Sequence, residues 1–222
     1  MPGFHTEARV GHMQIAIIGT GNVGRAIAKG LKGKGHLVVF GSRSDDAAKA
    51  AALTAETGAT IATPKDAAAG ADVVVLALPW TAAETAIREL GDLAGKTVID
   101  CMNPLGMVAG SLGLLIGHTD SGGETVQRWL PRTHVVKTLN QVGAEMMADN
   151  ARLPHRPVML MAGNEAAAKA KATTILAALG FEALDAGDIT KARLLEPFAM
   201  VWINQALIRG KGRAWAFAAV AA

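Results

Sequence analysis

The sequence has 222 residues, half of them hydrophobic, and its 22 basic and 19 acidic residues give a net charge of +3 at pH 7. This length and composition predict one globular domain, or one domain with a small appendage, and exclude a disordered chain. The mild charge gives no indication of a nucleic-acid partner, and the single cysteine, Cys101, excludes an intrachain disulfide and a thiolate metal cluster.

The sequence shows neither a targeting signal nor a membrane span. Residues 1–12 lack an apolar stretch, so we predict a flexible leader rather than a secretory signal. Apolar runs such as Val73–Trp80 are far shorter than the roughly 20 residues that a spanning helix needs. A single free cysteine is typical of reducing compartments, and we therefore expect a cytoplasmic protein without a membrane partner.

Strand and helix patterns alternate along the first half of the chain. Short apolar runs that end at Gly or Pro are typical of buried parallel strands, and we expect such strands at 14–19, 36–40, 60–62, 72–78 and 97–100. Good helix formers fill the segments between them, which predicts helices at 22–32, 45–57, 64–69 and 81–90.

The second half continues this alternation with weaker patterns. We expect strands at 134–139, 157–161 and 181–185, helices at 165–179 and 189–209, and a long loop at 106–123. The order predicts an α/β fold: a doubly wound parallel sheet with helices on both faces and a small C-terminal α/β extension. We divide the chain into a main domain at 13–150 and a C-terminal lobe at 151–222 packed on the same sheet.

A glycine motif follows the first expected strand directly. Residues 19–24 read GTGNVG, which fits the pattern GxGxxG, and they open the first expected helix. In such a motif Gly19 permits the tight turn, Gly21 lets a pyrophosphate approach the backbone, and Gly24 lets the helix pack close to the strand. The helix N-terminus offers free N–H groups to phosphates. We therefore predict a dinucleotide site in the domain at 13–150.

The end of the second expected strand indicates which dinucleotide binds. An NAD site carries Asp or Glu there, about 20 residues past the glycine motif, to bind the ribose 2′-OH. Here the chain reads FGSRS, and the first acid is Asp45. Ser42 can donate a hydrogen bond and Arg43 matches a 2′-phosphate in shape and charge, which favours NADP over NAD. The alternative is that Arg43 points into solvent.

Six segments together resemble one known family. They are GTGNVG at 19–24, VVFGSRS at 38–44, LALPW at 76–80, VIDCMNP at 98–104, VVKTLN at 135–140 and LDAGDITKARLLEP at 184–197. They are similar to the NADPH-dependent coenzyme F420 reductases, the deazaflavin:NADP oxidoreductases, and to the reductase domain of membrane ferric reductases. The resemblance implies a Rossmann domain, a small C-terminal segment and a homodimer.

The resemblance also implies how the adenosine end of NADP is held. Thr20, Ser42 and Arg43 fall on the family's adenosine-binding positions. The lysine that the family has four residues past its arginine is replaced here by Ala47, and Lys49 lies two residues further along. We therefore expect the 2′-phosphate to be bound more weakly, or by a different group.

At the other end, the resemblance places Leu78, Pro79 and Trp80 beside the nicotinamide. A tryptophan there supplies a flat apolar wall, although core packing is the alternative for Trp80. Asn103 either bonds to the nicotinamide half or only forms a turn. Asn140 stands where archaeal deazaflavin enzymes have histidine, while ferric reductases have asparagine in the comparable stretch; it either orients a ring or has no role at the site.

The predicted site is thus almost free of acid–base groups, since the six histidines are scattered along the chain. We predict Trp80 and Asn140 as catalytic residues and expect no metal. Arg193, Glu196 and Pro197 either shape the acceptor pocket or make a dimer contact. The cofactor-binding residues that we predict are Gly19, Thr20, Gly21, Asn22, Val23, Gly24, Ser42, Arg43, Leu78, Pro79, Trp80 and Asn103.

We therefore expect an NADP(H)-dependent oxidoreductase that transfers a hydride between NADPH and a flavin-like acceptor such as coenzyme F420. Direct transfer between two ring cofactors needs stacking and exclusion of water more than a proton donor. Two alternatives stay open: reduction of a small carbonyl or imine substrate, which requires a proton donor, and a non-catalytic NADP sensor.

Overall fold

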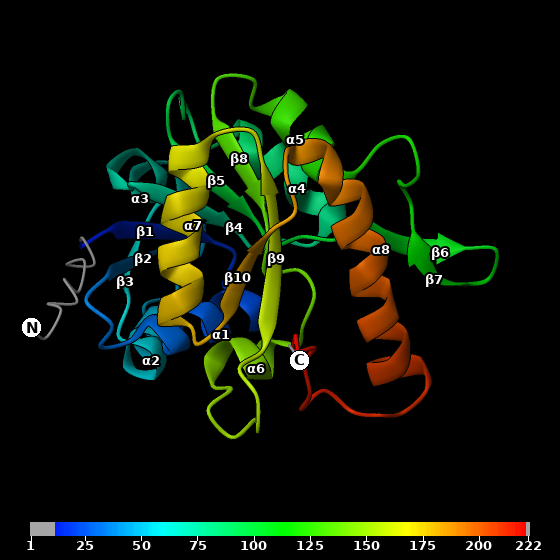
Figure 1. Ribbon diagram of the computed structural model, residues 1–222. Coiled ribbons are helices and arrows are strands. Elements are labelled where there is room, and N and C mark those ends of the chain that lie inside the picture. Colours follow the sequence, from blue (N-terminus) through cyan, green and yellow to red (C-terminus); the bar gives the residue numbers. More distant parts are fainter. Residues whose placement is uncertain (1–11, 221–222) are drawn as a thin grey trace, which may run out of the picture.

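In the computed structural model, which describes residues 12–220, eight strands form one sheet in the order β10-β9-β8-β5-β4-β1-β2-β3 (Figure 1). The strands are β1 Gln14–Ile18, β2 Leu37–Gly41, β3 Thr60–Ala62, β4 Val73–Leu76, β5 Thr97–Asp100, β8 His134–Lys137, β9 Val158–Gly163 and β10 Glu182–Asp185. All of the strands predicted from the sequence are present. The predicted flexible leader, apart from residue 12, lies outside the described residues.

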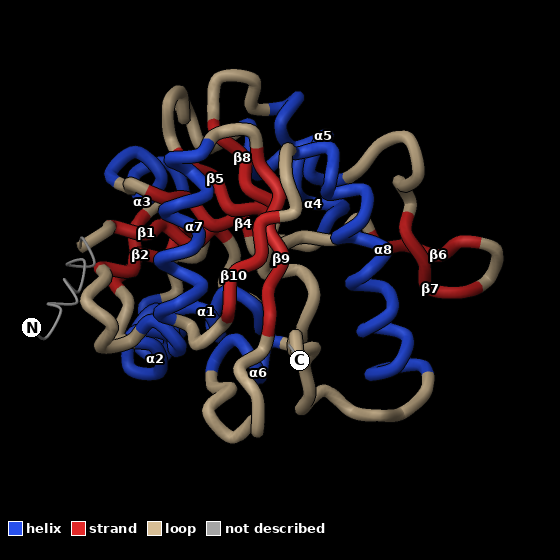
Figure 2. The backbone as a smooth tube through the Cα atoms, viewed as in Figure 1, coloured by secondary structure: helices blue, strands red, loops and turns tan. Residues whose placement is uncertain are grey.

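Helices cover both faces of this sheet because its central strands are apolar on both sides (Figure 2). Ile15 and Ile17 of β1 point into one core, and Ala16 and Ile18 point into the other. The first core is closed by α1 Asn22–Leu31, α2 Ala47–Thr57, α6 Ala144–Ala148 and α7 Ala166–Ala178. The second is closed by α3 Pro64–Gly70, α4 Trp80–Arg88 and α5 Gly122–Trp129. This is the predicted doubly wound α/β architecture.

Two strands, β9 and β10, run opposite to the other six, which differs from the prediction of a wholly parallel sheet. β9 pairs antiparallel with β8, and the pairing joins only Val136 to Gly163 and Lys137 to Ala162. β10 then pairs parallel with β9 and extends the sheet. The connection from β8 to β9 contains only α6, a helix of 5 residues, in place of the longer crossover helix that usually joins parallel strands.

The predicted long loop at 106–123 is wrong. Two strands, β6 Leu105–Val108 and β7 Ser111–Leu114, form an antiparallel hairpin that projects from the sheet beside the C-terminal helix (Figure 1). Its two-residue turn has positive φ at both Ala109 and Gly110, as tight hairpin turns require. Because alanine rarely adopts that conformation, only Gly110 signalled the turn in the sequence.

Near the C-terminus, three consecutive segments of different helix type follow one another without a break. A 3-10 turn at Ile189–Lys191 leads into α8 Ala192–Ile203, and a π-helical turn at Asn204–Ile208 follows. Trp202 packs with residues of the hairpin and with Trp215 of the returning tail. The tail carbonyl of Phe217 accepts a hydrogen bond from the N–H of Val158, at the start of β9. Within residues 12–220, each helix is too short or too polar to span a bilayer.

Candidate functional site

The glycine motif forms the turn between β1 and α1, and two of its glycines are packed tightly. Gly19 has a φ of 120°, and a Cβ built on it would lie 2.2 Å from the carbonyl oxygen of Ala77. A Cβ on Gly24 would lie 2.1 Å from the carbonyl oxygen of Gly19. Neither position accepts a side chain, because in both cases the obstacle is backbone.

Gly21 differs from these two. A Cβ on Gly21 would meet no atom of the described chain within 4 Å, so this backbone faces open space. Gly21 also caps α1 without a side-chain hydrogen bond from the described residues. The first-turn N–H groups and the positive end of the helix dipole are thus left for an anion. Arg25 supports the turn by donating to the carbonyl of Thr20, at 2.9 Å.

A hollow of about 480 Å³, the central hollow, opens in front of this turn. It lies at the carboxyl ends of the adjacent strands β1, β4 and β5, where open parallel sheets bind their ligands. Its lining consists of Gly21, Asn22, Val23, Ala77, Leu78, Pro79, Trp80, Thr81, Cys101, Met102, Asn103 and Leu105. The structure thus brings together seven of the predicted residues, drawn from three separate segments of the chain.

A second hollow of about 80 Å³, the side hollow, lies beyond the end of β2. Thr20 and Ser42, which we predict to bind the adenosine end of NADP, line it together with Arg25, Ser44 and Lys49. The sequence does not predict Lys49 as a phosphate-binding residue, because the family's lysine position is occupied here by Ala47 and Lys49 lies two residues further along. Since α2 begins at Ala47, Lys49 lies in its first turn and reaches this hollow.

The charges around the side hollow are exposed. Arg43, the residue after Ser42, is not among the described residues that line the hollow; its side chain is 71% exposed, and its guanidinium lies 3.9 Å from the carboxylate of Glu89. The ammonium of Lys49 lies 3.1 Å from Asp46, which caps α2. Hydrogen bonds from the backbone and side chain of Lys49 lower the pKa of Asp46. Both cations are therefore free to turn toward a more strongly charged anion.

Trp80 both lines the central hollow and packs in the core. Its ring lines the central hollow and also stacks on Trp129 of α5, with ring centroids 5.4 Å apart and planes inclined by 23°. A Cβ on Gly122 would lie 3.3 Å from the Trp80 ring, which shows how closely the start of α5 packs against it. The tryptophan is therefore a wall of the hollow fixed from behind by core packing.

Asn140 lies behind the central hollow and outside its described lining. Its side chain is 6% exposed and donates to the Asn103 side chain at 2.9 Å and to the carbonyl of Leu195 at 3.3 Å. Its own amide oxygen accepts from Gln141. The Asn103 amide in turn donates to the Asn140 carbonyl at 2.8 Å. Asn140 thus holds Asn103, which reaches the hollow, and its amide is committed to protein partners.

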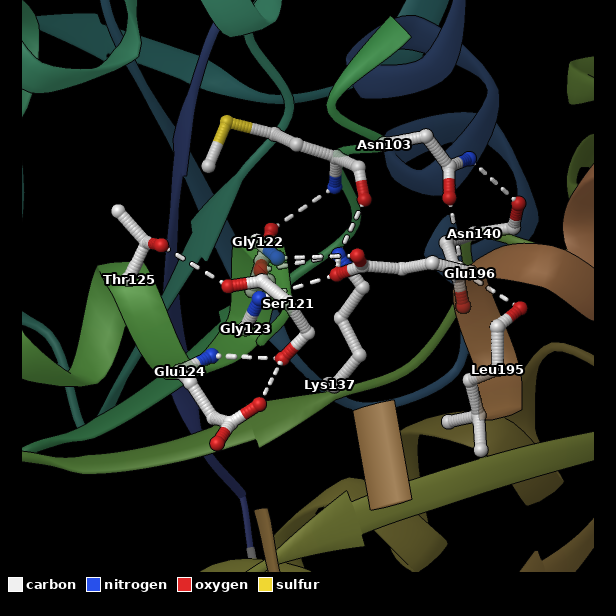
Figure 3. Close-up of polar contacts among 12 residues, drawn as sticks. Asn103, Ser121, Gly122, Gly123, Glu124, Thr125, Lys137, Asn140, Leu195 and Glu196 are labelled. Carbon is white, nitrogen blue, oxygen red and sulfur yellow. Dashed lines mark hydrogen bonds and ion pairs between the residues drawn. The ribbon is translucent and has the colours of Figure 1, made fainter. Parts of the chain in front are cut away.

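The sequence patterns missed a buried ionic cluster beside the hollow (Figure 3). Lys137 at the end of β8 lies 3.0 Å from Asp100 and 2.9 Å from Glu196, and its side chain is 0% exposed. Burial opposes the charge of Lys137, but attraction to Asp100 and Glu196 outweighs it and raises the pKa of the lysine. In the sequence, the one local indication of this cluster is that the apolar run Val135-Val136 ends in a charged residue, Lys137.

Arg193, Glu196 and Pro197, which the sequence suggests for an acceptor pocket or a dimer contact, lie in three different environments. Glu196 is buried and belongs to this cluster, whereas Pro197 is exposed. Arg193 binds Glu124 of α5 through two hydrogen bonds, of 2.8 and 2.5 Å. Cys101 is buried at the edge of the hollow, and desolvation raises the pKa of its thiol far above the usual range. In the part of the chain that the structure describes, His, Cys, Asp and Glu form no cluster able to hold a metal ion.

Comparison with known proteins identifies the relatives of this chain. The family model described as "NADP oxidoreductase coenzyme F420-dependent" matches residues 14–104. The F420-dependent NADP reductase of Methanocaldococcus jannaschii is 31% identical over 206 residues, which cover 86% of this chain and 92% of that protein. Metalloreductase STEAP3 of Rattus norvegicus is 29% identical over 184 residues, and the match spans only 36% of its length.

Solved structures show the same likeness. A crystal structure described as an F420-dependent NADP reductase from Arthrobacter sp. FB24 matches with a TM-score of 0.85 and 37% identity, covering 94% of this chain and 100% of that one. A reductive aminase from Aspergillus terreus matches with a TM-score of 0.66 at 23% identity, covering 90% of this chain and 64% of that one. At that identity the second match shows a shared fold only.

Proposed function

Since the chain belongs to the family of F420-dependent NADP reductases, we propose that it transfers a hydride between NADPH and a flavin-like acceptor, with coenzyme F420 as the first candidate. NADP(H) is the cofactor of this family. The observation that carries the choice of chemistry is the neutrality of the central hollow. Among the described residues that line it, none carries a charge, and the Cys101 thiol is held protonated by burial.

We propose the following placement of NADPH. The diphosphate lies over Gly21 and the start of α1, where the backbone is open and N–H groups are available. The 2′-phosphate lies at the side hollow, which Ser42 and Lys49 line, and the exposed side chain of the neighbouring Arg43 turns toward it. The nicotinamide end lies in the central hollow, and NADPH supplies the hydride there.

The chain's own residues contribute binding, orientation and exclusion of water. Trp80 and Leu78 supply apolar walls, and Asn103 supplies a polar group that Asn140 holds in place. A carbonyl or imine reductase needs a proton donor close to its substrate. The described lining lacks an ionised or readily ionised donor, so a second ring cofactor that accepts the hydride directly suits the hollow better.

The test is to follow NADPH absorbance while F420, FMN, FAD and a panel of small carbonyl and imine substrates are offered in turn. We expect oxidation with F420 and slower or no oxidation with the others. Turnover of a carbonyl or imine alone contradicts the proposed acceptor. NADPH binding without any turnover favours the sensor alternative. Failure to bind NADPH refutes the whole proposal.

We also propose that the protein is a soluble, cytoplasmic homodimer that pairs through the face formed by the hairpin and α8. Most of the large exposed apolar side chains of the described chain gather there: Met107, Val108, Leu115, Leu194, Val201, Leu207 and Ile208. Leu194 and Val201 lie two helical turns apart and so share one face of α8. A hollow of about 700 Å³ between β7 and the start of α8 adds concave surface next to them. Sedimentation of the wild type and of Val201→Glu tests this, and equal monomer masses for both contradict it.

A further inference from the structure

The buried ionic cluster of Asp100, Lys137 and Glu196 lies outside the described lining of the central hollow, yet its contacts lead directly to that lining (Figure 3). The three side chains come from β5, β8 and α8, and their exposed fractions are 0%, 0% and 1%. Buried charges are costly, so a cluster of this kind in a core calls for a physical reason.

The first set of contacts fixes the floor of the hollow. The Asp100 carboxylate accepts a hydrogen bond of 2.9 Å from the N–H of Met102. The ammonium of Lys137 donates to the carbonyl oxygen of the same residue. Both polar groups of the Met102 backbone are therefore held by the cluster, and Met102 and Asn103 line the hollow.

The second set of contacts fixes a wall of the hollow. The Glu196 carboxylate accepts hydrogen bonds from the N–H groups of Gly122 and Gly123, at 2.9 and 3.0 Å. These two residues begin α5. Gly122 packs against the ring of Trp80, and Trp129 of the same helix stacks on that ring. Glu196 thus ties the C-terminal helix α8 to the tryptophan wall.

We propose that Lys137 and Glu196 are positioning residues of the NADPH pocket, and that the charge balance of the cluster holds its floor and its tryptophan wall in one geometry. The inference rests on the proposed function for the identity of the ligand. It does not depend on which acceptor takes the hydride.

The charge balance of the cluster leads to a distinctive pH behaviour. The groups that face Lys137 are Asp100 of β5, Glu196 of α8 and the thiol of Cys101. Glu124 and Arg193, on the neighbouring turns of α5 and α8, pair with each other. Without the ammonium, Asp100 and Glu196 are two buried carboxylates with no cation between them, and such a pair is favourable only when one of the two carries a proton.

The main experiment uses Lys137→Met in a background in which Trp202 and Trp215 are Phe, so that fluorescence reports the Trp80–Trp129 pair. We expect the emission of the free protein to change with pH in the variant but not in the parent. We expect NADPH to bind roughly tenfold or more weakly at high pH and to recover part of that loss on acidification. The parent should show only the pH dependence that the titration of the 2′-phosphate itself gives, with a pKa of about 6, and Lys137→Met should differ from it.

Two further variants keep the inference falsifiable. Lys137→Met with Glu196→Gln removes one carboxylate along with the cation, and this double variant should return both signals to the parent's pH profiles. Glu196→Gln alone keeps the shape of the side chain and one acceptor, and tests the wall if Lys137→Met does not fold. The matched control is Glu124→Gln, which removes the more exposed ion pair between the same two helices and should leave NADPH binding within about twofold.

The outcomes separate this inference from the proposed function. If the parent fails to bind NADPH, the proposed function fails, while the fluorescence of the free protein still tests the cluster. If Lys137→Met and Glu196→Gln fold, bind NADPH like the parent and show the parent's pH profiles, the cluster has no positioning role.

Discussion

The two ends of the proposed cofactor site are built in opposite ways. At and next to the side hollow the cations that we propose for the 2′-phosphate are exposed, with side-chain exposures of 71% for Arg43 and 79% for Lys49. At the central hollow the described lining is uncharged, and the charges are buried behind it, with Lys137 at 0% exposure. On our proposals, the exposed charges select the cofactor, whereas the buried charges hold the shape of a neutral pocket.

The largest effect is expected at the glycine turn that joins the two ends. Gly24→Ala places a methyl group against the carbonyl of Gly19, and we expect it to lose roughly 2–4 kcal/mol of unfolding free energy and to abolish NADPH binding. Gly21→Ala is the matched control, because its methyl group enters open space. That variant should melt within a few degrees of the wild type and yet bind NADPH more weakly. Equal melting temperatures for the two variants contradict this distinction.

The next effect concerns cofactor choice at the charged end. Arg43→Ala and Lys49→Ala should each weaken NADPH binding by roughly tenfold and leave NADH binding almost unchanged, since only NADPH carries the 2′-phosphate. Arg88→Ala removes a comparably exposed arginine from α4 and should change neither. Binding titrations with both nucleotides at two salt concentrations measure the effect. Equal losses for NADPH and NADH remove the role that we assign to these cations.

The same contrast explains what could be predicted from the sequence. The strands, the glycine turn and the neutral residues of the central hollow lie in short recognisable segments of the sequence. An apolar run by itself indicates a buried strand, and a GTGNVG segment after such a run indicates a turn that binds a dinucleotide. Gly21, Leu78 and Asn103 then meet because parallel strands end at one edge of a sheet. This much of the site was therefore predictable.

The missed features depend on contacts between distant residues or on weak local signals. Lys137 and Glu196 are far apart in the sequence, and the residues around each of them do not indicate that the two side chains form an ion pair. The start of α5 did carry a local signal, the S-x-x-E sequence of residues 121–124: the Ser121 hydroxyl accepts from the N–H of Glu124 and donates to its carboxylate, so Ser121 caps the helix. However, Gly122 and Gly123 form the first turn of α5, and because glycine disfavours helix the sequence predicts a loop there. A Cβ on Gly123 would lie 2.9 Å from the Cβ of Ala192, and a Cβ on Gly122 would lie within 3.3 Å of Glu196 and Trp80, so the close packing favours glycine at both positions.

A moderate effect is expected behind the neutral end. Asn140→Ala removes an amide that bonds to Asn103, Gln141 and Leu195, and it leaves those buried groups without a partner. We expect a loss of about 1–3 kcal/mol in the free energy of unfolding, measured by denaturant titration. Because Asn103 then loses its support, the KM for NADPH should rise as well. Asn150→Ala, which breaks side-chain bonds to backbone carbonyls far from the hollow, should lower stability without changing the KM.

The smallest effect lies outside both ends, at the start of β2. Burial, and next the charge of His12, lower the pKa of His36, so the folded protein favours its neutral ring. Below the ordinary histidine pKa of about 6.5, the unfolded chain binds a proton that the folded chain resists. This contribution to stability is complete above that pH and is lost as the pH falls toward the lowered value.

Replacing His36 with Gln should therefore slightly reduce the acid sensitivity of the melting temperature. The pH profile of NADPH binding should stay unchanged, because His36 lies away from the carboxyl ends of the strands; a shift in that profile would couple this edge of the sheet to the cofactor site.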